Sequence, residues 1–430
     1  MIPALLTIGF ICFAALAFYR LDIALAVLVF LLPSYRIRFS LGPLPLTALE
    51  VLILICSFVW IIKLVQKKYS FPAVSKLLLY PALAFLLSAT FAVFVSPDIR
   101  EALGAWKAYF IEPFLFFVVC VSVVRTPEQI RRLLYALGFS ALLISIFGII
   151  QYITTIGLPA SWLGNSIEPR RIVSVFDYPN ALALYLAPII ALFAGLLLPR
   201  QDSRPLLSRL FAVVVVATSL VAIFLTFSRG GWLGVLAGFV VIGVLSSYRK
   251  YVVGLLLALV LIVVAVPSSR ERVLPLLQGK DVSSDVRLVL WQGSWNIVKA
   301  RPVLGAGLSG FRTYYAQYKL PQHIEILNYP HNIVLNFWLE TTIFGLASFV
   351  WLLVAWIVLI TQTLRSDSSR VFRALLIGLA AAIAAIVVHG FVDVPYLKND
   401  LAVQFWLFVA FTVISQQIIK SSHSTEFHQS

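Results

Sequence analysis

Long apolar runs recur along almost the entire chain and constrain its fold more than any other feature. A helix that crosses a membrane needs about 20 predominantly apolar residues. Runs of about that length occupy residues 46–62, 77–95, 105–124, 133–156, 181–198, 210–227, 231–245, 252–266, 333–364, 371–391 and 401–419. Hydrophobic residues make up 61% of the chain and charged residues 12%, whereas soluble domains average about 45–50% and about 25%. The sequence therefore predicts an all-α polytopic membrane protein, because the strands of a β-barrel would alternate over short segments.

The start of the chain is ambiguous. Residues 2–18 and 21–32 are both apolar but short, and Tyr19-Arg20-Leu21-Asp22 separates them. They could form one irregular span or a shallow hairpin, so the prediction is about 12 transmembrane helices, or about 13 with both counted. No cleavage site is evident after the first run, so we expect the transmembrane helices themselves to target the protein.

Short loops rich in Lys and Arg alternate with loops that are poor in them. The basic loops contain Lys63 to Lys76, Arg125 to Arg132, Arg200 to Arg209, Arg249-Lys250 and Arg365 to Arg373. Basic short loops stay in the cytoplasm, so residues 420–430 are predicted to be cytoplasmic and residues 157–180, 227–230 and 268–331 to lie on the far side. The chain then divides into an N-terminal bundle of about ten spans (1–267), a periplasmic loop domain (268–332) and three C-terminal spans with a short tail (333–430).

Arginine is unexpectedly frequent in the segments predicted to lie on the far side. Part of the net charge of +15 is the ordinary excess of Lys and Arg in cytoplasmic loops, but arginine on the translocated side needs another reason. One is snorkelling to lipid phosphates. The other is a bound anion, since Arg offers a planar fork of donors that suits phosphate. Arg170, Arg171 and Arg229 lie in these segments, and further arginines lie in residues 268–331.

Two features stand out inside the long polar segment. Residues 284–300 have the pattern of an amphipathic helix that Asp285 can cap, that belongs at the membrane interface, and that Arg301-Pro302 ends. Residues 305–310 read GAGLSG. This string is not a dinucleotide site, because no strand precedes it; it predicts a tight turn whose backbone N–H groups could approach a ligand.

Histidines stand at the ends of two apolar runs. His331 lies behind Pro330 and before Asn332. It could act as a general base, or it could merely bond the backbone at a helix end that Asn332 caps. His389 and Asp393 form a second pair, for which a structural His–Asp bond is the favoured interpretation, although polar groups at that depth often function.

The sequence has no pattern that would hold a metal or a nucleotide. It contains no D-x-D, no H-E-x-x-H and no Walker A motif. Its cysteines, Cys12, Cys56 and Cys120, all lie in apolar runs, which argues against disulfides and a Cys-rich metal site. We therefore expect no cofactor, and arginines rather than Mg²⁺ to neutralise any bound diphosphate.

Four blocks, in order, resemble the O-antigen ligase and polymerase superfamily of membrane glycosyltransferases. Residues 226–234 (TFSRGGWLG) are similar to its SRGG signature, and residues 171–180 (RIVSVFDYPN) to its R…F…PN entry into a span. Arg287, Trp291, Arg301 to Gly307 and Phe311 resemble its outer loop. Pro330-His331-Asn332 with Leu335, Glu340 and Gly345 resembles its HN…L…E…G segment. The blocks cover roughly residues 157–400.

The resemblance implies a GT-C-like, inverting and metal-independent glycosyltransferase of the bacterial inner membrane. Its donor would be a glycan on undecaprenyl diphosphate, and its site would face the periplasm. Ligases transfer the glycan to lipid A core, and polymerases transfer it to another repeat unit. Carried onto this chain, Arg171, Arg229 and Arg287 would hold the diphosphate, with Arg170 and Arg312 as weaker candidates. His331 would deprotonate the acceptor hydroxyl, with Asn332, His389 and Asp393 in support.

Three alternatives stay open beside O-antigen ligation. A polymerase of the same superfamily differs only in its acceptor, and no residue separates the two. A lipid-linked glycan transporter would show inverted repeats and charges near the midplane, whereas here the charge gathers at one face. A purely structural membrane subunit would leave His331 and the far-side arginines unexplained. No feature of the sequence indicates a nucleic-acid partner.

Overall fold

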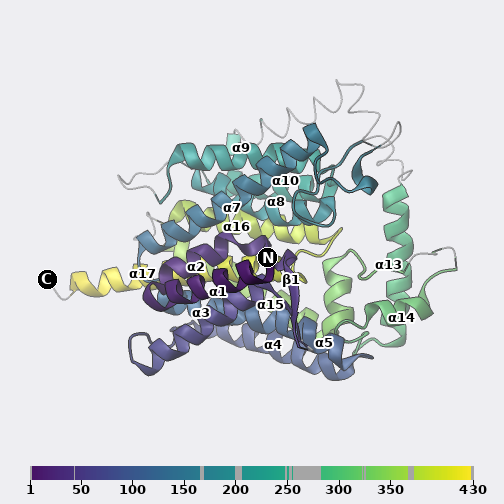
Figure 1. Cartoon of the computed structure of the whole chain (residues 1–430), viewed down its shortest axis with the longest axis horizontal. Coiled ribbons are helices and arrows are strands. Elements are labelled where there is room, and N and C mark those ends of the chain that lie inside the picture. The colour runs from purple at the N-terminus through teal and green to yellow at the C-terminus, as the bar shows by residue number, and fades with distance from the viewer. Residues whose placement is uncertain are drawn as a thin grey trace.

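The computed structural model describes residues 2–42, 44–164, 169–198, 206–246, 249–250, 254, 282–321, 323, 326–366 and 372–427. Within these ranges the chain is almost entirely helical (Figure 1). The described strands are β1 (Arg38–Leu41) and β2 (Leu44–Thr47), which pair antiparallel with Arg38 opposite Thr47. The predicted all-α class is therefore confirmed.

The helices match the predicted apolar runs closely. Eight of those in the described ranges are long and apolar enough to cross a membrane, and four are shorter. The longer ones are α3 (Ala48–Val65), α4 (Lys76–Val95), α5 (Ile99–Trp106) continuing through a π-helical turn (Lys107–Ile111) into α6 (Glu112–Val123), α7 (Pro127–Thr154), α8 (Pro179–Leu196), α15 (Ile333–Arg365), α16 (Arg373–Gly390) and α17 (Asn399–Phe427). The shorter ones are α1 (Ile2–Tyr19), α2 (Leu21–Phe30), α9 (Arg209–Leu225) and α10 (Arg229–Leu245). The predicted span 252–266 lies outside the described residues.

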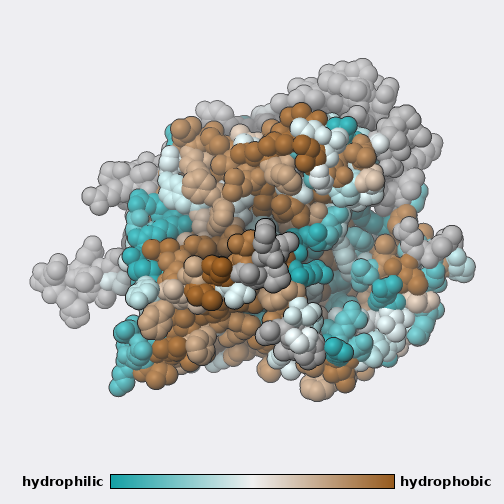
Figure 2. Space-filling model, in the orientation of Figure 1, coloured by the Kyte–Doolittle hydropathy of each residue, from teal (hydrophilic) through white to brown (hydrophobic). Residues whose placement is uncertain are grey.

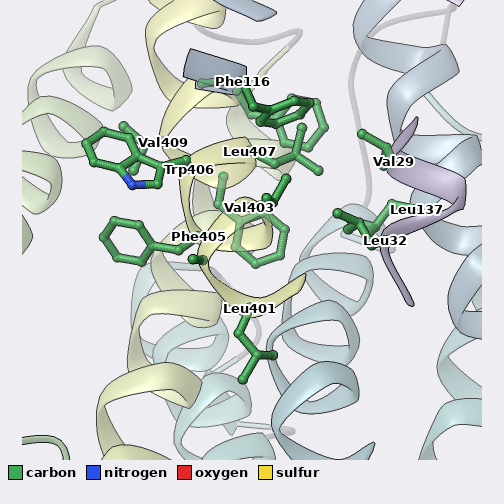
Figure 3. Close-up of a cluster of buried hydrophobic side chains, with 14 of the residues drawn as sticks. Val29, Leu32, Phe116, Leu137, Leu401, Val403, Phe405, Trp406, Leu407 and Val409 are labelled. Carbon is green, nitrogen blue, oxygen red and sulfur yellow. The ribbon is translucent and has the colours of Figure 1, made fainter. Parts of the chain in front are cut away.

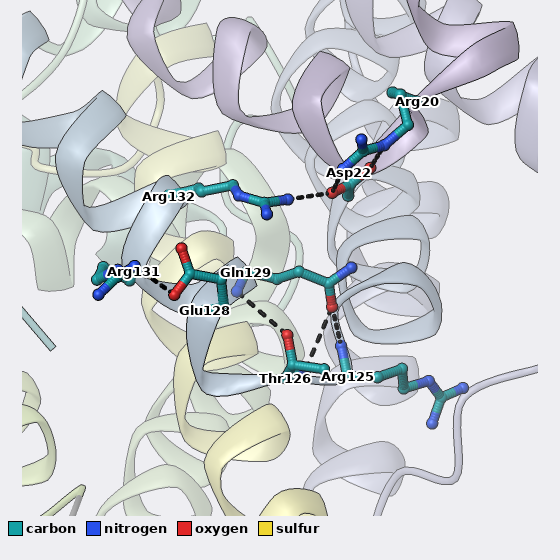
Figure 4. A network of polar contacts seen from close by, with 8 residues as sticks. All are labelled: Arg20, Asp22, Arg125, Thr126, Glu128, Gln129, Arg131 and Arg132. Carbon is teal, nitrogen blue, oxygen red and sulfur yellow. Dashed lines mark hydrogen bonds and ion pairs between the residues drawn. The ribbon is translucent and has the colours of Figure 1, made fainter. Parts of the chain in front are cut away.

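The start of the chain forms two helices rather than one span. Helices α1 and α2 meet at Arg20 and pack against each other and against α3. Asp22, in the first turn of α2, pairs with Arg20 at 3.1 Å and with Arg132 of α7 at 2.6 Å (Figure 4). These ion pairs tie the hairpin to the N-terminal end of α7, which is closed by a capping box between Thr126 and Gln129. The hairpin alternative is thus the observed one.

Helix α17 lies in the centre of the hydrophobic core. Of its spanning part, 83% is buried inside the bundle, and it contacts α3, α6, α7, α8, α15 and α16. Figure 3 shows Trp406, Leu407 and their neighbours on α17 beside Phe116 of α6. Helices from both the N-terminal and C-terminal parts of the chain therefore share one core.

Small residues bring three helices close together along α16. A Cβ on Gly234 of α10 would lie 2.9 Å from the carbonyl oxygen of Ala385, and one on Gly238 would lie 2.7 Å from Cβ of Ala191. Gly195 of α8 faces Gly378 of α16 in the same way. Small residues that let backbones approach are typical of helix packing in membranes. This packing fixes the start of α10 against the end of α16.

The long polar segment forms a small helical unit at one end of the bundle. It contains α13 (Val282–Ala300) and α14 (Phe311–Tyr318) and lies at the end opposite the C-terminus (Figure 1). The bundle surface between the ends is mostly hydrophobic (Figure 2). Helix α13 ends at Ala300 as predicted, but part of the apolar side that was predicted for the membrane interface packs elsewhere. Its Leu290 and Ile297 are fully buried against α14 and α15.

The glycine turn of residues 305–310 interrupts helix α15. Thr341 and Thr342 leave the helical conformation, and the carbonyl of Leu339 accepts the N–H groups of Ala306 (2.7 Å) and Gly307 (3.1 Å). The N–H of Ile343, which would otherwise bond Leu339, donates to Val303 at 3.1 Å. Residue 305 needs to be glycine for two reasons. Its φ is +63°, and a Cβ there would lie 2.6 Å from backbone oxygens of α15. The N-terminal part of α15, before Thr341, is therefore bonded to the segment between α13 and α14.

Candidate active site

His331 is held in a constrained backbone conformation just before α15. Its φ is +49°, in the left-handed region that non-glycine residues rarely occupy. Its Nδ1 lies 3.2 Å from Oδ1 of Asp393, and the two side chains are 22% and 1% exposed. An unusual backbone conformation that presents an ionisable side chain is common at functional sites. The imidazole edge opposite Asp393 is the one left to meet a substrate.

Asp393 bonds a different histidine from the one that the sequence predicted. His389 was expected to bond Asp393, but both of its ring nitrogens are buried without a hydrogen-bond partner among the described residues. The reason is that α16 ends at Gly390. The chain turns there, and Asp393 is no longer one helical turn above His389, so its carboxylate meets His331 instead.

Several contacts fix the position of His331. Asn332 caps α15, accepting the N–H groups of Val334 (3.0 Å) and Leu335 (3.1 Å), which confirms the predicted cap. Its Nδ2 donates to the carbonyl of Phe391 at 3.0 Å. On the other side, the indole N–H of Trp291 in α13 donates to the carbonyl of Pro330 at 2.9 Å. The backbone around His331 is thus tied to both α13 and the segment after α16.

Asp393 links the histidine to an arginine through an asparagine. Its Oδ2 accepts Nδ2 of Asn180 at 3.1 Å, and Oδ1 also accepts the N–H of Val394 at 2.9 Å. Burial alone would raise the pKa of Asp393, but the hydrogen bond from His331 and the charges of His331 and His389 lower it to about 2. Asp393 is therefore an ionised carboxylate at neutral pH, suited to orienting an imidazole and stabilising its charged form.

Arg171 continues this polar chain toward the turn between α9 and α10. Its Nη2 donates to Oδ1 of Asn180 at 3.2 Å, and its Nε donates to the carbonyl of Thr226 at 2.8 Å. The guanidinium also lies 5.3 Å from the ring centroid of Trp162. Arg171, Asn180, Asp393 and His331 therefore form one connected set of side chains.

Arg229 opens α10 beside the same cluster. Ser228 caps this helix by accepting the N–H of Gly231 at 3.4 Å. Gly230 packs so tightly on α16 that a Cβ there would lie 2.7 Å from Cδ2 of His389. The side chain of Arg229 is exposed, and its position adds a cation to the positive end of a helix dipole. The SRGG segment thus combines close packing with an arginine at a helix start.

Arg287 joins this group from α13. Its charge is close enough to act on His389, and it lies one helical turn before Trp291, which bonds the residue preceding His331. The structure therefore brings Arg171, Arg229 and Arg287 to the surroundings of His331. Three separate segments supply them: the loop before α8, the start of α10, and α13.

The two weaker arginine candidates lie apart from the connected set. Nη1 of Arg170 donates to the carbonyl of Tyr152 at 2.6 Å, and its guanidinium lies 5.8 Å from the Tyr152 ring. Arg170 thus points toward the end of α7, away from its neighbour Arg171. Arg312 is exposed on α14, and no described contact joins it to His331.

A tyrosine pair that was not predicted from the sequence lies beside the histidine. The ring of Tyr329 lies 4.3 Å from that of His331, and its hydroxyl is 2.9 Å from the hydroxyl of Tyr178. Nζ of Lys398 lies 4.6 Å from the Tyr178 ring centroid. Burial raises the pKa of both tyrosines and lowers that of Lys398. Tyr178 and Asn180 lie in the 171–180 block, and their place in that block was the one feature of the sequence that could have identified them as site residues.

These residues bring three arginines together with a histidine that is bonded to a buried carboxylate. Three arginines and a helix N-terminus can neutralise phosphate oxygens, and His331 can accept a proton while Asp393 stabilises the imidazolium. Among the described residues no group of three or more His, Cys, Asp or Glu side chains could hold a metal ion. The fold is that of a polytopic membrane protein, with a buried carboxylate, a histidine and three arginines gathered at one end of its bundle.

Comparison with known proteins shows a similarity to O-antigen ligases. A family model described as O-antigen ligase matches residues 212–350. The O-antigen ligase of Salmonella typhimurium is 26% identical over 308 residues, which cover 66% of this chain and 70% of that protein. Together with the ordered blocks described above, these matches support the O-antigen ligase superfamily and a glycosyltransferase of the O-antigen ligase type.

Proposed function

We propose that the protein transfers a glycan from undecaprenyl diphosphate to an acceptor hydroxyl, and that this acceptor is the lipid A core. The observation that carries the proposal is the placement of an imidazole, bonded to a buried carboxylate at 3.2 Å, beside Arg171, Arg229 and Arg287. A base for a hydroxyl and cations for a leaving diphosphate are the two requirements of this reaction.

In the proposed reaction the acceptor oxygen attacks the anomeric carbon of the donor. His331 takes the hydroxyl proton, the new C–O bond forms, and the bond between that carbon and the diphosphate oxygen breaks. A single displacement inverts the anomeric centre. A positioned base contributes roughly 10²–10⁴-fold, and donors aimed at the developing charge are usually the largest single contribution. Arginines in place of a metal ion fit a site without clustered carboxylates.

The proposed orientation follows the loop charges. The end of the bundle that carries α13 and α14 would face the periplasm, and the C-terminal end, where the basic loops lie, would face the cytoplasm of a bacterial inner membrane. The apolar space between helices would accept the polyprenyl tail of the donor.

Deletion of the gene tests this assignment through its glycolipids. Extracted lipopolysaccharide is run on a gel while undecaprenyl-linked glycan is measured in parallel. Loss of long glycan from lipid A core, with accumulation on undecaprenyl diphosphate, supports ligation. Core capped with a single repeat unit would instead identify a polymerase, and two unchanged pools would return the transporter alternative.

Two chromosomal variants test the residue roles. His331→Ala is expected to abolish transfer while leaving the fold and donor binding nearly intact. Arg229→Lys is expected to fail as well, because lysine loses the bidentate geometry of the guanidinium. Full activity of either variant would remove the corresponding role.

A further inference from the structure

An apolar groove opens beside helix α1, apart from the site described above. Its volume is about 370 Å³, within the range of small-molecule sites of roughly 300–1,000 Å³. It is lined by α1 from Leu5 to Leu16, by the end of α2, by Ser34 and Ile37, and by the start of α3 at Ala48 and Leu52. Almost the entire lining is hydrocarbon, so the groove suits an alkyl chain.

Ser34 adds one polar group to this lining. Its residue belongs to the short 3₁₀ helix η1 (Leu32–Arg36), and its Oγ is buried without a hydrogen-bond partner among the described residues. A buried hydroxyl without a partner is costly, and a serine hydroxyl can rotate to donate to an incoming oxygen. An acyl chain carries a carbonyl oxygen at its ester or amide end, whereas a polyprenyl chain carries none along its length. The lining therefore favours an acylated lipid over the polyprenyl donor.

The residues that follow Ser34 contact the loop that contributes to the candidate active site. The ring of the next residue, Tyr35, lies 6.4 Å from that of Phe176 in a tilted arrangement, and its hydroxyl lies 3.4 Å from Nζ of Lys398. Arg36 pairs with Asp177 and donates to the carbonyl of Val175 at 3.1 Å. Residues 175–177 belong to the same loop as Arg171 and Asn180. A lipid with its chain along α1 would hold its head group beside this loop, on the side away from α10.

From these observations we propose that the groove between α1, α2 and α3 binds an acyl chain of the acceptor lipid, with Ser34 donating to its ester or amide carbonyl. This proposal rests on the proposed function, because it names the acceptor as an acylated glycolipid. It places donor and acceptor on opposite sides of loop 171–180, so that the acceptor hydroxyl meets the anomeric carbon between them.

Gly9 provides a test that leaves the fold intact. It lines the groove, and a Cβ at this position would meet nothing within 4 Å. Gly9→Leu should fill the groove and raise KM for the acylated acceptor about tenfold, since it displaces roughly two methylene groups. The donor KM and the kcat at saturating acceptor should not change. Gly9→Ala, which shares the gain in helix propensity but barely fills the space, is the matched control.

Ser34→Ala completes the kinetic test. It should raise the acceptor KM about fivefold, as expected for one lost hydrogen bond. An unchanged acceptor KM in Gly9→Leu would overturn the proposal, and so would an increase in the donor KM alone, which would assign the groove to the polyprenyl chain. A core oligosaccharide stripped of its acyl chains should react equally with wild type and Gly9→Leu; a difference between them would also count against an acyl site.

A binding measurement separates this proposal from the proposed function. Cys12 lines the groove and is exposed, whereas Cys56 and Cys120 are buried, so an apolar maleimide in detergent should label Cys12 selectively. The acylated acceptor should slow this labelling, and undecaprenyl diphosphate at the same concentration should not. If wild type transfers no glycan but the acylated lipid still protects Cys12, the reaction is wrong and the groove stands. If transfer occurs without protection, the groove is wrong and the reaction stands.

Discussion

Replacing Asp393 with asparagine removes the negative charge beside His331 and keeps the size of the side chain. Asp393 is 1% exposed and receives hydrogen bonds from His331, Asn180 and the N–H of Val394. Burial would raise its pKa, yet its neighbours hold the pKa at about 2, against an ordinary 3.8. This difference corresponds to roughly 2 kcal/mol of favourable interaction with the ionised form.

The sign of the pH dependence follows from that lowered pKa. A carboxyl group whose pKa is depressed in the folded state contributes stability above its ordinary pKa of 3.8 and loses it as the pH falls toward 2. Asp393 therefore stays ionised between pH 5 and 9.

The expected loss in rate is large enough to measure directly. A hydrogen bond to a charged group is worth about 1.5–3 kcal/mol, so kcat should fall roughly 10- to 150-fold while the donor KM changes little. The assay is transfer of a labelled glycan between purified lipids in proteoliposomes. Asp400→Asn, a buried carboxylate at the start of α17, is the matched control and should keep its kcat. A folded Asp393→Asn enzyme with wild-type kcat would refute the assigned role.

Three further changes probe the surroundings of the site. Gly230→Ala should destabilise the packing of α10 on α16 by about 1–3 kcal/mol, because its Cβ would lie 2.7 Å from a buried imidazole; an unchanged melting temperature in detergent would contradict this close packing. Asn332→Ala should cost about 1 kcal/mol, as for any lost cap, and should lower transfer more than Thr126→Ala, which removes the cap of α7 at the other end of the bundle; equal activities would mean that the cap does not position the base. Tyr178→Phe and Tyr329→Phe each break the same 2.9 Å hydrogen bond, so each should cost about 1 kcal/mol, and the double variant should cost no more than either one; additive losses in a double-mutant cycle would show that the hydroxyls act separately.

The transmembrane helices could be predicted from the sequence because they depend on local composition. Each apolar run must satisfy its own backbone hydrogen bonds in lipid, and a helix does so without reference to the rest of the chain. The same locality made the cap at Asn332 and the end of α13 before Pro302 predictable. The hairpin of α1 and α2 stayed ambiguous because Asp22 finds its partner Arg132 on α7, far along the chain.

The partners within the site could not be predicted, because they depend on where separate segments meet. The spacing of His389 and Asp393 suggested a bond along one helix, but the helix stops between them. Arg170 and Arg171 are equivalent in a linear pattern, whereas in a non-helical segment successive side chains point to opposite sides. Asn180 follows a proline at a helix start, and its contacts with Arg171 and Asp393 arise only from tertiary packing.

The break in α15 bears on how the site responds to the membrane around it. A spanning helix tilts or bends to match the thickness of the bilayer. A helix with an unbroken series of backbone hydrogen bonds would transmit that movement along its whole length. In α15 this series of hydrogen bonds is interrupted at Leu339, whose carbonyl accepts the N–H groups of Ala306 and Gly307. The first part of α15, residues 333–340, packs against α13 and α14 and is separated by this break from the rest of the helix. We therefore expect α15 to bend at Thr341 and Thr342 when the thickness of the bilayer changes, while α13 and the segment after α16 hold the backbone around His331.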